Sequence, residues 1–250
     1  MTKFDAERLA STLLVARTRR TQTTVRDAPP QVDDAYAAQD AVARRVGAIG
    51  GWKVGAKTPI AEPTCAPLFG SLIRPSPASW PAAEFHMIGI EAEVAFRLAR
   101  DVAPGFGPLG AEEVYAHVAS AHPAIEVVDT RLADWRHADP LTLLADNQMN
   151  GRFVYGDPVA DWRSIDLANI AVRLSIDGKV TVDSVGGNTG GDPLRLLVWL
   201  VNHCRERRAG LAAGAIVTTG SFTGMTFVEP GARADAYFPQ LGRASVEFPR

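Results

Sequence analysis

The 250-residue sequence predicts an α+β fold, in which two N-terminal helices precede a mostly β body with a few covering helices. Apolar residues recur at helical spacing in the first 46 residues. From Gly50 onward, the chain breaks into short β-like runs that are rich in Gly and Pro. We therefore expect an N-terminal helical region, residues 1–49, and a β-rich body, residues 50–250.

The helices are expected at three places. Apolar spacing places the first over residues 4–20 and the second over residues 32–46. A third is expected over residues 193–208, with Asp192 as its N-cap and Gly210 just past its end.

The clearest strands form a hairpin over residues 170–184, where alternating residues flank Asp177-Gly178, a strong two-residue turn. Further strand-like runs are GIEAEVAF (89–96), HPAIEVVDTR (122–131), AIVTTGSFTG (215–224) and GRASVEF (242–248). The third of these runs into a Gly-rich loop.

Composition excludes several classes of protein. With 26 basic and 28 acidic residues, the chain has no general positive field for nucleic acid. Cys65 and Cys204 lack metal-ligand spacing, so we expect plain thiols in a reducing compartment. The first residues show no apolar signal segment, and the longest apolar run, near 194–201, is too short to cross a bilayer. We expect a soluble, cytoplasmic protein without a membrane partner.

Two glutamates interrupt the run at residues 89–96. On a strand, Glu91 and Glu93 point to the same face, and Glu126 offers a third carboxylate on another strand. Three carboxylates from two strands suit a hard divalent cation such as Mg²⁺ or Mn²⁺. The alternative is a solvated face, or pairing with nearby cations: Arg97, Arg131 or Lys53.

Six segments together resemble a known family. They are GWKVGAKT (51–58), GIEAEVAF, HPAIEVVDTR, LADNQMNGRFVYG (144–156), DPLRLLVWLVN (192–202) and GAIVTTGSFTG with VEPG. In order and spacing they resemble the 2-keto-4-pentenoate hydratase and 4-oxalocrotonate decarboxylase branch of the fumarylacetoacetate hydrolase superfamily. The likeness runs from about residue 30 to the C-terminus.

The resemblance implies a mixed β-roll catalytic body preceded by helices. It implies Mg²⁺ or Mn²⁺ held by Glu91, Glu93 and Glu126. It also implies that Lys53, in the GWKVG segment, is a catalytic proton handler or carboxylate anchor, and that Asp146 is a supporting catalytic group.

The implied activity is that of a metal-dependent lyase on a small 2-oxo or 2-hydroxydienoic acid, with a hydratase as the first expectation. The alternatives are a 2-oxo diacid decarboxylase, an acylpyruvate C–C hydrolase, a cyclase or isomerase on a metal-bound enol, and a non-catalytic partner subunit. Further expectations are a homo-oligomer, a complex with a pathway enzyme, and a role in the catabolism of aromatic compounds.

The Gly220–Gly224 loop is a candidate for substrate binding. Ser221 and Thr223 could supply hydroxyls to a substrate carboxylate, although a plain Gly-rich turn is an equal alternative. Arg131 is expected to orient Glu126 or Asp129.

The chain departs from the branch at Leu68. The branch usually carries Pro-Asp-Phe-Gly here, and this chain reads APLFG, so Leu68 takes the place of an acid/base aspartate at the substrate site. Leucine cannot relay a proton, so Glu62 or a water takes over, or the reaction differs. Met149 and Asn150 replace small residues and are expected to reshape the pocket.

Overall fold

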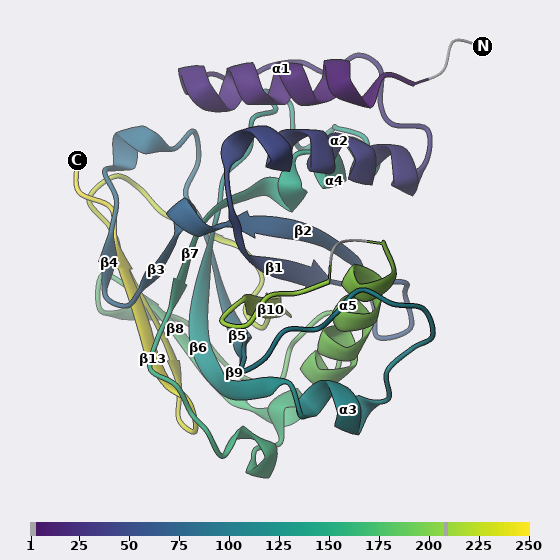
Figure 1. The fold of residues 1–250 in the computed structure, drawn as a ribbon. Coiled ribbons are helices and arrows are strands. Elements are labelled where there is room, and N and C mark those ends of the chain that lie inside the picture. Colours follow the sequence, from purple (N-terminus) through teal and green to yellow (C-terminus); the bar gives the residue numbers. More distant parts are fainter. Residues whose placement is uncertain (1–3, 208–209) are drawn as a thin grey trace.

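The computed structural model describes residues 4–207 and 210–250 and contains two mixed β-sheets with helices packed above and beside them (Figure 1). The predicted α+β class, with N-terminal helices followed by mixed sheets, is confirmed.

The two N-terminal helices lie together above the sheets (Figure 1). Helix α1 (Ala6–Arg19) begins at Asp5, whose carboxylate accepts a hydrogen bond from the Arg8 N–H at 3.0 Å. Helix α2 (Val32–Val46) has the predicted bounds and turns a buried alanine-rich face toward the body of the protein.

The third predicted helix is α5 (Pro193–Arg207), and Asp192 caps it by accepting a hydrogen bond from the Leu194 N–H at 2.8 Å. The last residue predicted for this helix, Arg208, lies outside the described residues. Two short helices that the sequence did not predict are α3 (Ala111–Tyr115) and α4 (Pro140–Ala145). Short 3₁₀ turns complete the connections: Gly70–Leu72, Ala82–Glu84, Asn147–Met149, Trp162–Ser164 and Leu167–Asn169.

The larger sheet has the strand order β2-β1-β10-β5-β6-β7-β3, and β11 pairs with β5 outside this path. Its strands are β1 (Ile49–Gly55), β2 (Thr64–Phe69), β3 (Ile73–Pro75), β5 (Gly89–Leu98), β6 (Val118–Val128), β7 (Asn150–Tyr155), β10 (Ile216–Ser221) and β11 (Thr226–Phe227). Pairing is parallel between β1 and β10 and between β3 and β7, and antiparallel elsewhere in this sheet.

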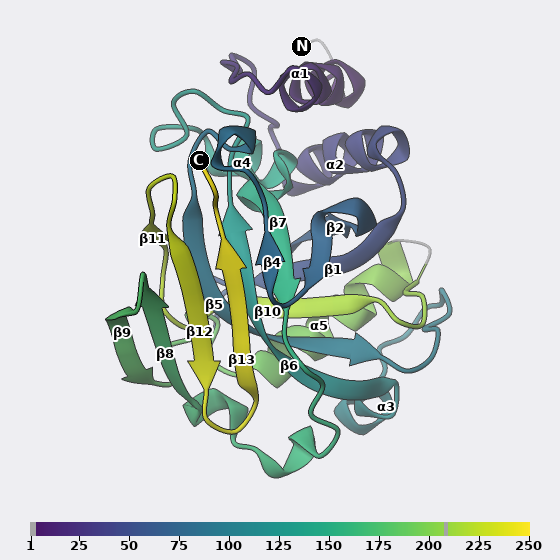
Figure 2. The same ribbon diagram turned by 90° about the vertical axis from the view of Figure 1, so that its left-hand side faces the viewer.

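The smaller sheet has the order β4-β13-β12-β8-β9, and Figure 2 shows it facing the viewer in front of β5 and β6. Its strands are β4 (Ala78–Ser79), β8 (Ala171–Ile176), β9 (Lys179–Val185), β12 (Arg233–Phe238) and β13 (Gly242–Glu247). The predicted hairpin turn is confirmed, because Asp177 (φ 51°) and Gly178 (φ 78°) both adopt the left-handed conformation that such a turn requires.

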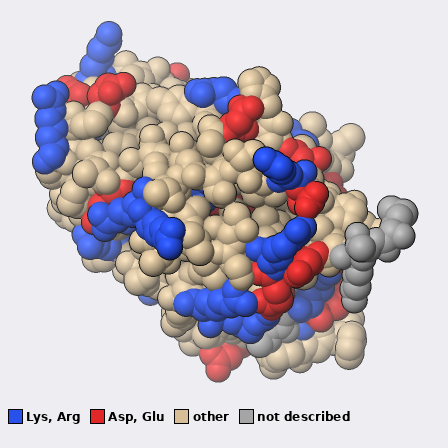
Figure 3. Space-filling model, turned by 90° about the horizontal axis from the view of Figure 1, so that it is seen from above, with Lys and Arg blue, Asp and Glu red and all other residues tan. Residues whose placement is uncertain are grey.

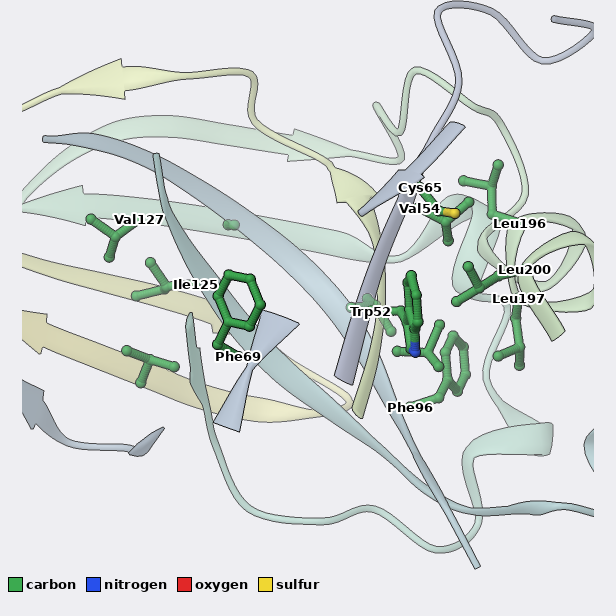
Figure 4. Packing of buried hydrophobic residues seen from close by; sticks show 14 of the residues in the cluster. Trp52, Val54, Cys65, Phe69, Phe96, Ile125, Val127, Leu196, Leu197 and Leu200 are labelled. Carbon is green, nitrogen blue, oxygen red and sulfur yellow. The ribbon is translucent and has the colours of Figure 1, made fainter. Parts of the chain in front are cut away.

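The core fills the space between the sheets and under α5. Figure 4 shows Leu196, Leu197 and Leu200 of α5 directed toward Trp52 and Val54 of β1. All five side chains are at most 4% exposed, so truncating one of these leucines to alanine is expected to cost about 2–5 kcal/mol. This packing fixes the outer face of β1 and leaves its inner face for polar side chains.

Lys and Arg side chains are intermixed with Asp and Glu side chains on the face seen from above (Figure 3). Pairs such as Arg44–Glu7 and Arg207–Asp33 account for part of this mixture. Among the helices of the described residues, none combines the length and apolarity needed to cross a membrane.

Candidate functional site

Strand register brings three carboxylates together on one sheet face. Glu91 of β5 lies directly opposite Glu126 of β6, and Glu93 follows Glu91 at the two-residue repeat of a strand. The residues that alternate with them on β5, Ile90, Ala92 and Val94, point the other way and are fully buried in the core. One oxygen from each of the three carboxylates lies within 4.8 Å of the others.

Glu126 is held firmly through only one of its oxygens. It is fully buried, and its Oε1 accepts hydrogen bonds from Lys53 Nζ at 2.6 Å and from Asn150 Nδ2 at 2.9 Å. Its Oε2 is also buried and has no hydrogen-bond partner within residues 4–207 and 210–250. A buried carboxylate oxygen without a donor is costly, which indicates that a further ligand completes this site.

The other two carboxylates are difficult to ionise where they stand. Burial, and after it the charge of Glu126, raises the pKa of Glu91 to about 7. The same two causes, in the same order, raise the pKa of Glu93 well above its ordinary value. Hydrogen bonds from the side chains of Ser221 and Thr218 only partly offset this effect.

These observations fit a divalent cation. Oxygen ligands are what Mg²⁺, Mn²⁺ and Ca²⁺ take up, and a positive ion would remove the repulsion among the three carboxylates. Glu126 Oε2 is available for such an ion because Lys53 and Asn150 occupy only the other oxygen. Glu91, Glu93 and Glu126 are therefore the residues that would hold the metal.

Lys53 lies beside this cluster on the inner face of β1. Burial alone would lower the pKa of Lys53, but the combined charges of Glu126, Glu91 and Glu93 outweigh it and raise the pKa. A second hydrogen bond runs from Lys53 Nζ to the Gln148 carbonyl at 3.1 Å. Lys53 is thus held as a cation, with two of its three N–H donors engaged.

The Gln148 carbonyl is presented by a strained turn. Asn147, Gln148 and Met149 have φ values of 54°, 48° and 61°, although none of them is glycine. A left-handed non-glycine residue costs on the order of 1–3 kcal/mol, so the surrounding contacts must hold this turn in place. Gln148 Nε2 contributes one such contact, a hydrogen bond to Thr64 Oγ1 at 2.6 Å.

A cavity of about 740 Å³ opens next to the carboxylates. Charged and polar side chains line one part of it, including Lys53, Glu91 and Glu93, and an apolar wall comes from Pro140, Leu143, Leu144 and Met149. A second cavity of similar size, about 720 Å³, lies between α2 and residues 210–215 but contains none of these acidic or basic groups. The two cavities are similar in size, so it is the presence of Lys53, Glu91 and Glu93 in the lining that makes the first one the candidate site.

The two predicted hydroxyl residues have different positions. Ser221 lines the cavity beside Glu91, as a substrate contact would. Thr223 does not line it: its Oγ1 accepts a hydrogen bond from the Ala92 N–H at 3.1 Å and donates one to the Gly224 carbonyl at 3.1 Å. The Thr223 hydroxyl thus ties the loop to β5 in this structure, and substrate binding by Thr223 stays a prediction.

Asp146 is buried among polar partners. It is 2% exposed and does not line the cavity. Its Oδ1 accepts a hydrogen bond from Arg131 Nε at 2.5 Å, and its Oδ2 accepts from Thr130 Oγ1 at 2.8 Å and from the Arg131 N–H at 3.0 Å. In this structure Asp146 holds Arg131 in place, and Arg131 pairs with it rather than with Glu126 or Asp129. A catalytic role for Asp146 stays a prediction.

Leu68, expected at the substrate site, is 1% exposed and does not line the cavity. It packs in an apolar cluster: Ala95, Ala124, Phe153 and Ile216. Ala95 and Ala124 lie two residues along their strands from Glu93 and Glu126, so this cluster continues the carboxylate face as a closed apolar layer. Leu68 is thus separate from the cavity lining in this structure, and its place at the substrate site stays a prediction.

The sequence reading missed the roles of several residues near the site. Gln148 supplies a carbonyl to Lys53, Asn150 donates to Glu126, and Thr218 donates to Glu93. Gln148 and Asn150 lie in the same family-like segment as Asp146, and this proximity in sequence was the one indication that they belong to the site. The directions of the Gln148 carbonyl and the Asn150 amide depend on the strained turn, which the sequence does not reveal. Met149 lines the cavity, consistent with the expectation that it shapes the pocket.

Comparison with known proteins agrees with this geometry. The model of the family described as fumarylacetoacetate (FAA) hydrolase C-terminal matches residues 37–248. A 2-keto-4-pentenoate hydratase from Paraburkholderia phymatum is 31% identical over 258 residues, covering 97% of each chain. A 2-keto-4-pentenoate hydratase from Paraburkholderia xenovorans is 29% identical over 228 residues, covering 87% of this chain and 84% of that protein.

Among solved structures, 4-oxalocrotonate decarboxylase from Pseudomonas putida G7, complexed with magnesium and adipate, superposes with a TM-score of 0.85 at 25% identity. The alignment covers 99% of this chain and 98% of that one. With a family match over most of its length and this carboxylate-lined cavity, the chain belongs to the fumarylacetoacetate hydrolase C-terminal family.

Proposed function

We propose that this protein is a divalent-metal-dependent lyase acting on a small 2-oxo or 2-hydroxydienoic acid, with hydration of a 2-hydroxydienoate as its first candidate reaction. The observation that carries the proposal is the convergence of Glu91, Glu93 and Glu126 beside the cationic Lys53 at one cavity. The curated relatives named as 2-keto-4-pentenoate hydratases support the choice of reaction.

Mg²⁺ is the first candidate metal and Mn²⁺ the second, and the magnesium-bound decarboxylase supports this order. When bound, the ion would supply Lewis-acid stabilisation to the negative charge that develops on the C2 oxygen of the substrate. Glu126 would offer Oε2 to the ion because its Oε1 is engaged by Lys53 and Asn150.

Lys53 acts as a proton donor or as an anchor for the substrate carboxylate. Its raised pKa keeps it charged at neutral pH, which favours donation over acceptance of a proton. Two of its N–H groups are bound to Glu126 and Gln148, so one remains for the substrate. Lys53→Met should therefore abolish turnover while leaving calorimetric Mg²⁺ binding measurable, and loss of both would show that Lys53 mainly holds Glu126 in place.

Hydration needs a proton at C5 of the dienoate and a water at C4, and Leu68 can supply neither. Glu62 is the remaining carboxylate among the described residues that line the cavity. Its Oε1 accepts a hydrogen bond from Trp199 Nε1 at 2.7 Å, which holds it at the mouth of the cavity. We assign the activation of water to Glu62, so Glu62→Gln should lower hydration strongly with little change in metal affinity.

Lys57 favours a second candidate reaction, decarboxylation of a 2-oxo diacid. Lys57 lines the same cavity, is exposed, and forms no ion pair with an acid in the described part of the chain. Because Lys53 is already paired with Glu126, Lys57 is the cation that remains to bind a second carboxylate at the far end of a substrate. In that reaction the C–C bond to the β-carboxylate breaks and CO₂ leaves, and the electron pair of that bond passes to the C2 ketone, which becomes the enolate.

One assay separates these reactions. Purified protein is supplied with 2-hydroxydienoates, 2-oxo diacids and acylpyruvates, each with and without Mg²⁺, and loss of substrate and release of CO₂ are followed. Mg²⁺-dependent consumption of a dienoate without CO₂ supports the hydratase, and CO₂ release from a diacid supports the decarboxylase. Cleavage of an acylpyruvate would indicate a C–C hydrolase, and isomerisation without added water would indicate an enol isomerase.

A non-catalytic partner subunit is the opposing possibility. It would turn over no 2-oxo acid by itself and would become active only when a pathway enzyme is added. We further propose a cytoplasmic homo-oligomer, which light scattering of the purified protein at several concentrations would test.

A further inference from the structure

A small cavity of about 150 Å³ lies where the C-terminal end of α1 meets the ends of β6 and β7. It shares no lining residue with the carboxylate-lined cavity. Its lining is rich in guanidinium groups: Arg17, Arg20, Arg131 and Arg152. The acidic side chains in the lining are those of Glu84 and Asp129.

Three of the arginines have partners. Arg131 pairs with Asp146 and also donates to the carbonyls of Asp146 and Asn150, so three of its five guanidinium N–H donors are engaged within the protein. Arg152 and Arg20 share Glu84, at 2.7 Å and 3.6 Å. Arg152 Nε is buried and has no hydrogen-bond partner in the described structure.

Arg17 has no such partner. Its guanidinium lies 5.4 Å from the centre of the Phe69 ring, and no acid or carbonyl in residues 4–207 and 210–250 accepts a hydrogen bond from it. Burial, and next the positive charge of Arg131, lowers the pKa of Arg17 to about 9. A partly buried guanidinium beside other cations is costly unless an anion accompanies it.

Asp129 does not supply that anion. Its Oδ1 accepts hydrogen bonds from the backbone N–H groups of His86 and Met87, both at 3.2 Å, and it forms no ion pair with Arg17. Counting Asp146, the partner of Arg131, four guanidinium groups face three carboxylates here. The cavity therefore keeps an excess of positive charge.

We propose that this cavity binds a small tetrahedral oxyanion, phosphate or sulfate, with Arg17 as its principal ligand and Arg152 and Arg20 beside it. Guanidinium groups suit such oxyanions because their planar N–H groups donate in pairs. A volume of about 150 Å³ equals about five waters, enough for one such anion and too small for a nucleotide. The bound anion would fasten α1 to the ends of β6 and β7.

The test is a calorimetric titration of the whole protein with inorganic phosphate, sulfate and acetate, at ionic strength matched with chloride. The wild type should bind phosphate or sulfate at one saturable site and acetate more weakly. The variant Arg17→Met should bind at least about tenfold more weakly, because it loses charge-assisted hydrogen bonds. The control Arg19→Met removes an exposed arginine two residues away on the same helix and should bind like the wild type.

Thermal unfolding gives a second readout. Phosphate should raise the melting temperature of the wild type and of Arg19→Met in a concentration-dependent way, and it should not raise that of Arg17→Met. Repeating the titration with Mg²⁺ present identifies any phosphate bound at the carboxylate-lined cavity, since that binding would persist in Arg17→Met.

Three results would overturn the proposal. The first is that the wild type shows no saturable binding of phosphate or sulfate up to about 10 mM. The second is that Arg17→Met binds the anion as tightly as the wild type does, and the third is that acetate binds as tightly as phosphate. If Arg17→Met does not fold, Arg17→Lys replaces it. That variant keeps the charge but loses the paired donors, so it should bind the anion severalfold more weakly.

Discussion

The contacts of Asp146 lead to a measurable prediction about stability. In the variant Asp146→Ala, the Arg131 guanidinium would lose the carboxylate that faces it, while remaining in a place where its side chain is only 5% exposed. The hydroxyl of Thr130 and the N–H of Arg131 would lose their acceptor as well. Breaking one side of a buried ion pair costs about 3–5 kcal/mol.

That cost corresponds to a large shift in melting temperature. For a domain of this size, 1 kcal/mol lowers the melting temperature by about 2–4 °C, so Asp146→Ala should melt roughly 6–20 °C below the wild type. The assay is thermal and urea unfolding followed by circular dichroism. The control is Asp183→Ala, which breaks the exposed Arg173–Asp183 pair, whose side chains are 50% and 57% exposed, and which should cost less than about 1 kcal/mol.

A different result would favour the catalytic role predicted for Asp146. If Asp146→Ala unfolds at the same temperature as Asp183→Ala and yet loses turnover, Asp146 acts on the substrate rather than on Arg131. If the positioning role is correct, Asp146→Asn, which keeps one acceptor oxygen, should recover part of the lost stability.

Three further predictions concern the metal, the apolar layer and pH. Asn150→Ala should weaken Mg²⁺ binding about 10–100-fold by calorimetry, because it removes the donor that fixes Glu126. The control Asn169→Ala changes an exposed residue and should bind Mg²⁺ like the wild type, and equal affinities of the two variants would contradict metal binding by Glu126. Leu68→Asp should lower the free energy of unfolding in urea by at least about 3 kcal/mol and should gain no hydration activity on a dienoate, because it places a carboxylate in an apolar layer. The control Leu68→Met should stay within about 1.5 kcal/mol of the wild type. A Leu68→Asp variant that is both stable and active would place that position at the substrate site. Burial, and after it the charge of Arg207, lowers the pKa of His203 to about 4, so the neutral ring, stacked on Trp199, favours the folded state. The stability that it contributes is complete above pH 6.5 and is lost as the pH falls toward 4, and urea midpoints at pH 7 and 5 should therefore differ less in His203→Phe than in the wild type.

Much of the fold could be predicted from local sequence, because the signals are short-range. The apolar spacing of residues 32–46 specifies an amphipathic helix, and Asp177-Gly178 can form a hairpin turn without help from distant residues. The strand at residues 122–131 was placed less well, since β6 begins at Val118 and ends at Val128. Its earlier start depends on pairing with β5, which is a long-range contact.

The candidate site divides in the same way. The two-residue repeat of a strand places Glu91 and Glu93 on one face whatever surrounds them. That Glu126 lies opposite Glu91 depends on the register of two strands separated by a long connection. The strand-like run at residues 122–131 made Glu126 a candidate third ligand, and the resemblance to a family supported that choice.

The surroundings of three predicted site residues depend on tertiary contacts. Leu68, Thr223 and Asp146 stand next to suggestive residues in the sequence, but their neighbours in the structure are an apolar layer, a backbone N–H and a buried arginine. Which residue types are available, and which of them share a strand face, could be read from the order of the amino acids, because both follow from local chain geometry. Which polar groups satisfy one another in the interior depends on the folded arrangement, because burial requires each of them to find a partner and that partner lies far away in the chain.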